Sequence, residues 1–229
     1  MFSVTQLNVF YGESQVIHDV SFQVKPGESL AIMGRNGMGK TTLLKSLIGL
    51  LPARSGEIRL EEQAIHDLPS HRRVQHGLAF VPQGRMVFPY LTVEENILTG
   101  AEHSGHRDVP EYIYQFFPVL KEMKQRNAGN LSGGQQQMLA IARALISDPK
   151  VLILDEPTEG IQPSIIKELA QTLNVLRHER GFSVVVSEQV LSFALDLADR
   201  FLVIDRGRIV HEEQRANVNQ EKVKSFLTV

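Results

Sequence analysis

The stretch Gly34-Arg35-Asn36-Gly37-Met38-Gly39-Lys40-Thr41 decides the fold of this 229-residue chain. It follows an apolar segment, residues 29–33, that is predicted to be a buried strand, and it precedes leucines at helical spacing. Strand, glycine-rich loop and helix in this order are the context of a phosphate-binding loop. The glycines let the backbone curl so that successive N–H groups point at phosphate oxygens, and the helix adds its positive end. A chance glycine-rich turn is the alternative, and the flanking strand and helix argue against it.

The residues after the last glycine give this loop its chemistry. A lysine at position 40 would reach the β- and γ-phosphates, and the Thr41 hydroxyl would bind Mg²⁺. ATP and Mg²⁺ are therefore the predicted cofactors. The predicted nucleotide-binding residues in this segment are Gly34, Arg35, Asn36, Gly37, Met38, Gly39, Lys40, Thr41 and Thr42.

Two carboxylates end a second apolar strand, Val151-Leu152-Ile153-Leu154-Asp155-Glu156. Side chains at this place project from the carboxyl edge of a sheet, where open α/β folds bind ligands. We expect Asp155 to hold Mg²⁺, directly or through water, and Glu156 to orient and polarise the attacking water. A solvated acidic strand end is the alternative, and the presence of a phosphate loop in the same chain argues against it.

A third position, Gln83, follows a predicted strand at Leu78–Val81 and stands where the sequence changes to helical patterns. A neutral amide here can bind Mg²⁺ or the attacking water, and it can release them when the helical part rotates. An ordinary loop glutamine is the alternative.

A second glycine pair occurs in Leu131-Ser132-Gly133-Gly134-Gln135. The serine and the glutamine three residues later have the spacing of a capping box, so a helix is predicted to begin here. Its N-terminus is a second anion-binding surface. Because one γ-phosphate hardly needs two such loops from one domain, we expect this one to face a partner's nucleotide. A plain helix cap is the alternative.

The composition limits the classes of function. A formal net charge of −2 argues against a broad nucleic-acid-binding face, and nucleic acid is not a predicted partner. The chain has no cysteine, which excludes disulfides and thiolate metal sites. No secretory signal is visible, and the apolar runs are far shorter than the roughly 20 residues that span a bilayer. A role at a membrane would have to come through a partner.

The order of patterns predicts one α/β domain over residues 1–229. Residues from about 1–84 and 148–229 alternate strands and helices, with early β segments broken at Gly12, Pro26-Gly27 and Ser55-Gly56. Residues from about 85–147 are helical and are predicted to be an insertion.

Two further segments carry specific expectations. Phe201–Val210 is predicted to be a hairpin with its turn at Arg206-Gly207. The apolar run Met86–Leu91 either packs inside the helical insertion or forms a groove beside Gln83 that receives a partner's helix.

The phosphate loop, residues 131–135 and the Asp155-Glu156 strand, in this order, resemble the ATP-binding cassette (ABC) ATPases. The resemblance implies a P-loop NTPase fold with a RecA-like core, an antiparallel β subdomain and an inserted α-helical subdomain. It implies that two such domains pack head to tail, with ATP between one phosphate loop and the other's Ser132–Gln135. It also implies that Tyr11, just before Gly12, stacks on adenine, for which an ordinary packed turn tyrosine is the alternative.

The residues of two segments resemble one subfamily in particular. The phosphate loop resembles the ATPases of bacterial importers for branched-chain amino acids, urea and short amides, and Glu156–Ser164 looks most like the urea branch. The resemblance implies an energy-coupling ATPase of an importer for urea or short amides, with a branched-chain amino acid importer as the alternative. The implied partners are a second, distinct ATPase subunit (or a second copy in isolation), two permeases and, indirectly, a periplasmic binding protein. The implied location is the cytoplasmic face of the inner membrane.

Two positions depart from the broad family. Members of the broad family usually have an aspartate soon after the acidic pair, where this chain has Gln162. They usually have a histidine after the next strand, where this chain has Gln189. Gln189 can hydrogen-bond a γ-phosphate but cannot become a cation. We therefore expect Glu156 to carry most of the catalytic work, with Gln83 and Gln189 beside it. A soluble cassette ATPase acting on nucleic acid, ribosomes or cluster assembly and a poorly hydrolysing regulatory module are the competing functions.

Overall fold

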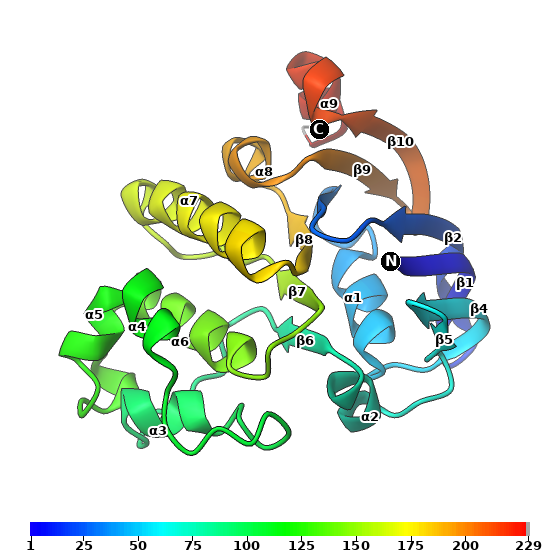
Figure 1. The fold of residues 1–229 in the computed structure, drawn as a ribbon. Helices are drawn as coiled ribbons and strands as arrows, with labels where there is room; N and C mark the ends of the chain where they lie inside the picture. The colour runs from blue at the N-terminus through cyan, green and yellow to red at the C-terminus, as the bar shows by residue number, and fades with distance from the viewer. Residues whose placement is uncertain (228–229) are drawn as a thin grey trace.

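Two β-sheets organise the computed structural model, which describes residues 1–227 (Figure 1). The larger sheet has the order β10 (Arg208–Gln214), β9 (Arg200–Asp205), β3 (Ser29–Met33), β8 (Ser183–Glu188), β7 (Val151–Asp155) and β6 (Leu78–Val81). The strands from β9 to β6 run parallel, and β10 pairs antiparallel with β9. The smaller, antiparallel sheet has the order β2 (Ser14–Val24), β1 (Phe2–Tyr11), β4 (Ala53–Leu60) and β5 (Gln63–Ala64).

The helices lie on both sides of the larger sheet (Figure 1). Toward the smaller sheet lie α1 (Lys40–Ile48) and α2 (Ser70–Gln75), and on the other side lie α7 (Pro163–Arg180) and α8 (Leu191–Leu197), while α9 (Gln220–Leu227) packs near β10. Between β6 and β7 the chain forms α3 (Val93–Leu98), α4 (Glu111–Phe116), α5 (Pro118–Glu122) and α6 (Gly133–Leu145), which gather at one end of the molecule. The α/β fold class is confirmed. The division into a core and an inserted subdomain stays a prediction.

Side chains of the parallel strands alternate between two hydrophobic cores, as the two-residue period of a strand requires. In β3, Leu30 and Ile32 pack with α1 and the smaller sheet, whereas Ala31 and Met33 pack with α6, α7 and α8. All five residues of β3 are buried. Burial on both faces explains why the central strands are continuous apolar runs in the sequence.

Four neighbouring strands end at the same edge of the larger sheet, because β3, β8, β7 and β6 are parallel. Met33 is aligned with Glu188, and Asp155 with Ser187. The phosphate loop follows β3, and Gln83 comes two residues after the last residue of β6, Val81. The fold therefore brings the segments predicted to carry chemistry to one edge.

One expected chain break is wrong. Ser55-Gly56 lies inside β4 rather than between strands. Gly56 has a φ of 101°, and a Cβ there would lie 2.5 Å from the Gln6 carbonyl oxygen on β1. The pairing of β1 with β4 shifts register between Thr5 and Asn8. The glycine thus marks a bulge in a continuous strand, which a sequence cannot readily distinguish from a turn.

The expected hairpin is confirmed, with β9 and β10 joined at Arg206-Gly207. Its turn also contacts the phosphate loop. The Gly207 N–H donates to the Met38 carbonyl at 2.9 Å, and the Gly207 carbonyl accepts from the His18 N–H at 2.9 Å. The Arg206-Gly207 turn, distant in the sequence, therefore stabilises the loop that follows β3.

A buried arginine holds the far end of the phosphate-loop helix. Arg73 on α2 is 2% exposed, and its guanidinium donates to the carbonyls of Ser46 (2.7 Å) and Leu47 (2.9 Å) in the last turn of α1. It also donates to the carbonyls of His66 and Leu68. Cations are favoured at a helix C-terminus, where carbonyls lack partners within the helix.

We expect Arg73→Met to lower the free energy of unfolding by about 2–4 kcal/mol, because it leaves several carbonyls without a donor. Urea unfolding of the full chain measures this loss. The matched control is Arg72→Met, at an exposed position of the same helix, which should change stability by less than about 0.5 kcal/mol. Equal effects of the two substitutions would show that the buried hydrogen bonds contribute little.

Candidate functional site

The phosphate loop joins β3 to α1 in a conformation that few other residues permit. A Cβ at Gly34 would lie 2.5 Å from the Ile204 carbonyl oxygen, so this position needs glycine. Gly39, with a φ of 105°, immediately precedes α1, and within residues 1–227 no side chain caps the start of that helix. The amide groups of its first turn are therefore available to phosphate oxygens.

A cavity of about 220 Å³ lies over this loop. It is lined by residues from β2, the phosphate loop, α1 and the ends of β6 and β7, namely Val16, Asn36, Gly37, Gly39, Lys40, Thr41, Thr42, Gln83 and Glu156. The structure thus brings Gln83 and Glu156 to the predicted phosphate site. Gly34, Arg35 and Met38 shape the loop without lining the cavity, and Tyr11, 49% exposed at the end of β1, lies outside it.

Asp155 is buried at the end of β7, with 2% exposure. Its Oδ1 accepts from the hydroxyls of Thr41 (3.1 Å) and Ser187 (2.6 Å). Burial raises the pKa of this carboxyl group. Its other oxygen, Oδ2, is buried without a hydrogen-bond donor among residues 1–227. A buried carboxylate oxygen with an open coordination site beside a threonine hydroxyl fits Mg²⁺, which prefers oxygen ligands.

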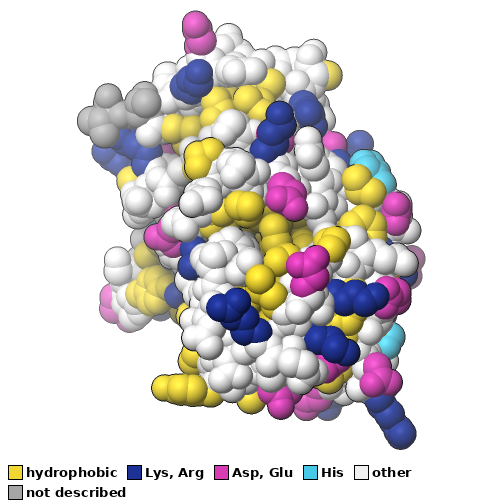
Figure 2. All heavy atoms as spheres, turned by 90° about the vertical axis from the view of Figure 1, so that its left-hand side faces the viewer, with side chains coloured by type: hydrophobic (Ala, Val, Ile, Leu, Met, Phe, Trp, Pro, Cys, Tyr) yellow, Lys and Arg dark blue, Asp and Glu magenta, His cyan; other side chains and the backbone are white. Residues whose placement is uncertain are grey.

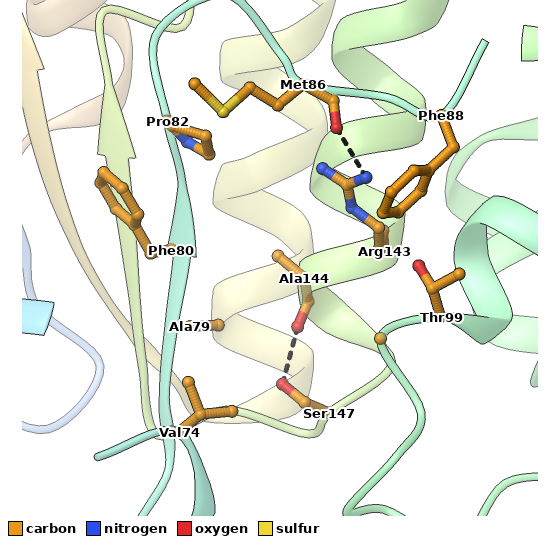
Figure 3. A pocket seen from close by; sticks show the side chains of 11 residues that line it. Val74, Ala79, Phe80, Pro82, Met86, Phe88, Thr99, Arg143, Ala144 and Ser147 are labelled. Carbon is orange, nitrogen blue, oxygen red and sulfur yellow. Dashed lines mark hydrogen bonds between the residues drawn. The ribbon is translucent and has the colours of Figure 1, made fainter. Parts of the chain in front are cut away.

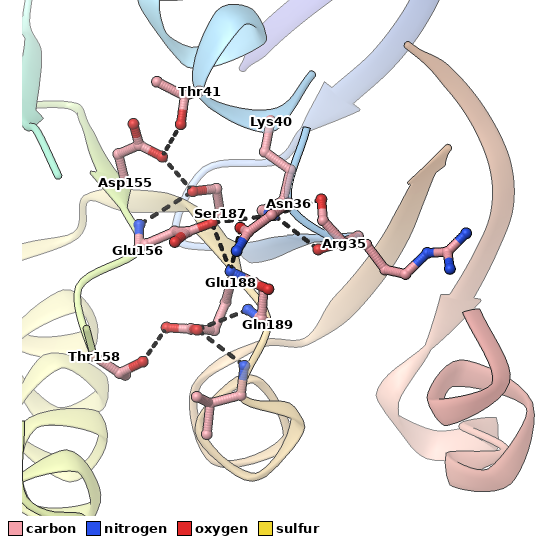
Figure 4. A network of polar contacts seen from close by, with 12 residues as sticks. Arg35, Asn36, Lys40, Thr41, Asp155, Glu156, Thr158, Ser187, Glu188 and Gln189 are labelled. Atoms are coloured by element: carbon pink, nitrogen blue, oxygen red, sulfur yellow. Dashed lines mark hydrogen bonds and ion pairs between the residues drawn. The ribbon is translucent and has the colours of Figure 1, made fainter. Parts of the chain in front are cut away.

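Lys40 and Glu156 both line the cavity, and their side chains form an ion pair (Figure 4). The lysine is 4% exposed, and its Nζ lies 3.1 Å from the Glu156 Oε1. The same ammonium donates to the carbonyls of Gly34 (2.7 Å) and Arg35 (3.1 Å). The pair places one cation and one carboxylate on the surface where phosphate and water would meet.

Gln189 lies against the same carboxylate. Its Nε2 donates to the Glu156 Oε1 at 3.0 Å and to the Asn36 Oδ1 at 2.7 Å (Figure 4). The amide thus connects the end of β8 with the end of β7 and with the phosphate loop. This contact brings together two of the three residues predicted to act in catalysis.

The backbone of Glu156 is held in an uncommon conformation. Its φ is 45°, in the left-handed region that non-glycine residues seldom adopt. Its N–H donates to both the Oγ and the carbonyl of Ser187, each at 3.1 Å. Such a conformation persists where surrounding contacts over-determine it, which is common at functional sites.

Three polar residues beside this site, Ser187, Glu188 and Thr158, were not predicted from the sequence. All three are buried, and the Thr158 hydroxyl donates to the Glu188 Oε2 at 2.7 Å. A signal was present, because Ser187-Glu188 ends a buried strand in the same way as Asp155-Glu156. The pairing of β7 with β8 makes these two acidic strand ends neighbours.

Residues 131–135 lie elsewhere, at the start of α6. Ser132 and Gln135 form the predicted capping box, with the Gln135 side chain accepting from the Ser132 N–H at 2.9 Å. Leu131 is buried, and a Cβ at Gly134 would lie 2.9 Å from the Ile165 side chain. None of Leu131, Ser132, Gly133, Gly134 and Gln135 lines the 220 Å³ cavity.

The apolar run Met86–Leu91 is largely exposed rather than packed inside the helical part. Met86, Phe88 and Tyr90 are 66%, 49% and 89% exposed. The first two border a groove of about 390 Å³ that runs between β6 and α6 (Figure 3), lined by Val74, Ala79, Phe80, Pro82, Met86, Phe88, Thr99, Gly100, Arg143, Ala144 and Ser147. Met86, Phe88 and Tyr90 are therefore not packed inside the helical part, and a groove that receives a partner's helix stays a prediction.

Two arginines form contacts around the groove: Arg143 binds residues that line it, and Arg85 binds the loop that follows Glu156. Arg143 on α6 lies 5.5 Å from the centre of the Phe88 ring and donates to the Met86 carbonyl at 2.8 Å. Arg85 donates to the Glu159 carbonyl at 2.8 Å, in the loop that follows Glu156. The segment after Gln83 therefore borders the groove and also contacts the loop that follows Glu156.

Charges of both signs are interspersed on the face of the molecule shown in Figure 2, which gives this face no broad positive area. Across residues 1–227, none of the helices has the length and apolar character needed to span a membrane.

Known proteins resemble this chain over nearly its whole length. The family model described as ABC transporter matches residues 17–159. The high-affinity branched-chain amino acid transport ATP-binding protein BraG of Pseudomonas aeruginosa is 44% identical over 98% of this chain and 97% of its own length. The probable branched-chain amino acid transport ATP-binding protein LivF of Archaeoglobus fulgidus is 37% identical over 91% of this chain and 90% of its own length.

Solved structures of ATP-binding cassettes resemble the fold of this chain. An ATP-binding cassette of an ABC transporter in its ADP conformation superposes with a TM-score of 0.84 at 27% identity, covering 99% of this chain and 94% of that one. A dimeric cassette in a post-hydrolysis state, bound to ADP and phosphate, has a TM-score of 0.84 at 26% identity, covering 94% of this chain and 99% of that one. With the phosphate loop, Asp155 and Glu156 placed as described, this chain belongs to the ABC transporter family and is an ATPase of that family.

Proposed function

We propose that this chain is the ATP-hydrolysing subunit of an importer for branched-chain amino acids. The observation that carries the proposal is the cavity where Lys40, Thr41 and Glu156 meet, in a chain whose relatives at 44% and 37% identity are named for branched-chain amino acid transport. Urea is a second candidate solute, favoured by the resemblance of Glu156–Ser164 to the urea branch. The ATPase does not touch the solute in either case.

In this proposal the cavity binds the triphosphate of ATP, and a bound Mg²⁺ would neutralise part of the phosphate charge. Lys40 holds the phosphates, while Thr41, Asp155 and Gln83 would hold the metal or its water. Glu156 orients and polarises the attacking water, and the amide of Gln189 holds that carboxylate and faces the γ-phosphate. Tyr11 offers its exposed ring to adenine.

A second ATPase subunit completes each nucleotide site. The support is the position of Leu131–Gln135, which begins a helix but does not line the cavity of its own chain. Its helix N-terminus is free to face a nucleotide held by another subunit. The partner is a distinct ATPase in the native complex, and a second copy of this chain can replace it in isolation. A post-hydrolysis dimer exists for a structural relative.

The groove beside Phe88 is where we place the contact with the permeases, on the cytoplasmic face of the membrane. Exposed Met86, Phe88 and Tyr90 offer apolar area to a partner's helix, and the groove between β6 and α6 offers the concave surface. The proposed complex contains two permeases, and a periplasmic binding protein delivers the solute.

We expect Phe88→Asp to prevent recovery of the permeases with this chain from detergent extracts, because a carboxylate in an apolar groove loses hydration on docking. ATP binding, measured with a fluorescent nucleotide, should stay within about twofold, since Phe88 does not line the nucleotide cavity. Val175→Asp is the matched control, because Val175 is similarly exposed (48%) but lies on α7, away from the groove. Normal permease recovery with Phe88→Asp would place the docking surface elsewhere.

The whole proposal is tested by recovering tagged Glu156→Gln protein with ATP from gently solubilised membranes of its own organism. Two permeases and a second ATPase are the expected companions, and recovery of soluble factors alone would refute the importer function. The binding protein of the same complex is then titrated with leucine and with urea. Binding of leucine supports the principal proposal, and binding of urea alone replaces it with the second.

A further inference from the structure

Glu188 is a buried carboxylate that none of the roles above uses. It ends β8, is 2% exposed and does not line the nucleotide cavity. Its Oε2 accepts from the Thr158 hydroxyl at 2.7 Å, and its Oε1 accepts from the N–H groups of Gln189 (2.7 Å) and Val190 (2.9 Å). Figure 4 shows Glu188 between Thr158 and Gln189, below Glu156.

The hydrogen-bond partners of Glu188 suit a carboxylate. Burial raises the pKa of this group above its usual value, the three hydrogen bonds offset part of that rise, and the nearby Glu156 carboxylate adds to it. All three partners are donors, and an ionised carboxylate accepts from all of them without rearrangement. Hydrogen bonds to a charged acceptor are about twice as strong as those between neutral groups.

The two segments that Glu188 holds are the segments that carry catalysis. Thr158 lies two residues after Glu156, and the side chain of Gln189 contacts Glu156 at 3.0 Å and Asn36 at 2.7 Å. One carboxylate therefore fixes the backbone of Gln189 and the loop after Glu156 at the same time. A change at Glu188 shifts Gln189 relative to Glu156 without removing either residue.

A purely stabilising role does not require this charge. Burying a carboxylate is unfavourable unless it is well paired, and apolar residues of similar volume often give equal or greater stability. We propose that Glu188 is a positioning residue for ATP hydrolysis, which holds Gln189 and the Thr158 loop so that the Gln189 amide meets the Glu156 carboxylate. This inference rests on the proposed roles of Glu156 and Gln189.

The test uses the full-length chain purified with the subunits it retains, and measures kcat and KM for ATP. Glu188→Gln, which keeps the shape and removes the charge, should lower kcat at least about tenfold with KM within about twofold. Thr158→Val removes one of the three donors and should give a smaller loss of kcat. The matched control is Glu28→Gln, which neutralises another largely buried carboxylate, paired with Arg200 at 2.7 Å far from the cavity. It should lower the melting temperature but leave kcat unchanged.

A double-mutant cycle separates positioning from stability. In a Gln189→Ala background, Glu188→Gln and Thr158→Val should lower kcat by less than about twofold, since residues that act as one unit are not additive. An undiminished further loss in that background would overturn the proposal, as would an unchanged kcat in Glu188→Gln or in Gln189→Ala. If Glu188→Gln does not fold, Thr158→Val carries the same cycle. Absence of ATP hydrolysis in the unmutated complex would instead refute the proposed function.

Discussion

Replacing Glu156 with glutamine is expected to lower ATP hydrolysis by about 10²- to 10⁴-fold while ATP still binds. The glutamine keeps the shape of the side chain and can still accept from Lys40 and Gln189, which contact the Glu156 Oε1 at 3.1 and 3.0 Å. It cannot accept a proton from the attacking water. Steady-state phosphate release measures the loss, and a fluorescent nucleotide measures the retained affinity.

The matched control for this prediction is Glu168→Gln, which makes the same change of charge at an exposed position of α7. Its kcat should be that of the unmutated chain. Near-normal hydrolysis by Glu156→Gln would assign the catalytic work to another group, with the Gln189 amide and Gln83 as the remaining candidates at the cavity. Very slow hydrolysis already in the unmutated complex would favour the regulatory function.

The elements that could be predicted are those whose signal is local. The strands β3 and β7 are continuous apolar runs because both of their faces are buried. The capping box at Ser132 follows from residues three positions apart, and it is present. The phosphate loop, Asp155 and Glu156 could be found because each follows a predicted strand, and parallel strands bring such positions to one edge.

The contacts that could not be predicted join distant parts of the chain. Arg73 appears in the sequence as an ordinary charged helix residue, and only the fold shows that it caps α1. The partner of Glu188 is Thr158, 30 positions away in the sequence. Gly56 fits a turn or a bulge equally well until β1 lies beside β4. Such features depend on tertiary packing, which local patterns do not encode.

The class of solute also could not be predicted from the residues of the site, for a different reason. In the proposed complex the cavity holds the nucleotide, and the groove beside Phe88 would meet a permease rather than the solute. In this proposal the selection of the solute therefore belongs to other subunits. The resemblance of Glu156–Ser164 to the urea branch and the relatives named for branched-chain amino acids can differ without any conflict in the chemistry of this chain.

We expect Lys40→Ala to weaken ATP binding by about 2–3 kcal/mol, or roughly 30- to 150-fold in Kd, because it removes a charged donor to the phosphates. Lys40 is 4% exposed, and its ammonium is held by the Gly34 and Arg35 carbonyls and by Glu156, so its position is fixed before a nucleotide binds. A preorganised charge loses little conformational entropy on binding. Titration with a fluorescent nucleotide measures the change in Kd.

Lys45→Ala is the matched control, since Lys45 belongs to the same helix but lies in its last turn, away from the phosphates. It should leave the Kd unchanged and lower stability by no more than about 1 kcal/mol, through the loss of a cation near the helix C-terminus. ATP at about ten times the Kd of the unmutated chain should raise the melting temperature of that chain and of Lys45→Ala, and should hardly raise that of Lys40→Ala, because the stabilisation grows with the ratio of ATP concentration to Kd. A folded Lys40→Ala protein with unchanged ATP affinity would mean that the amide groups of the phosphate loop alone hold the triphosphate.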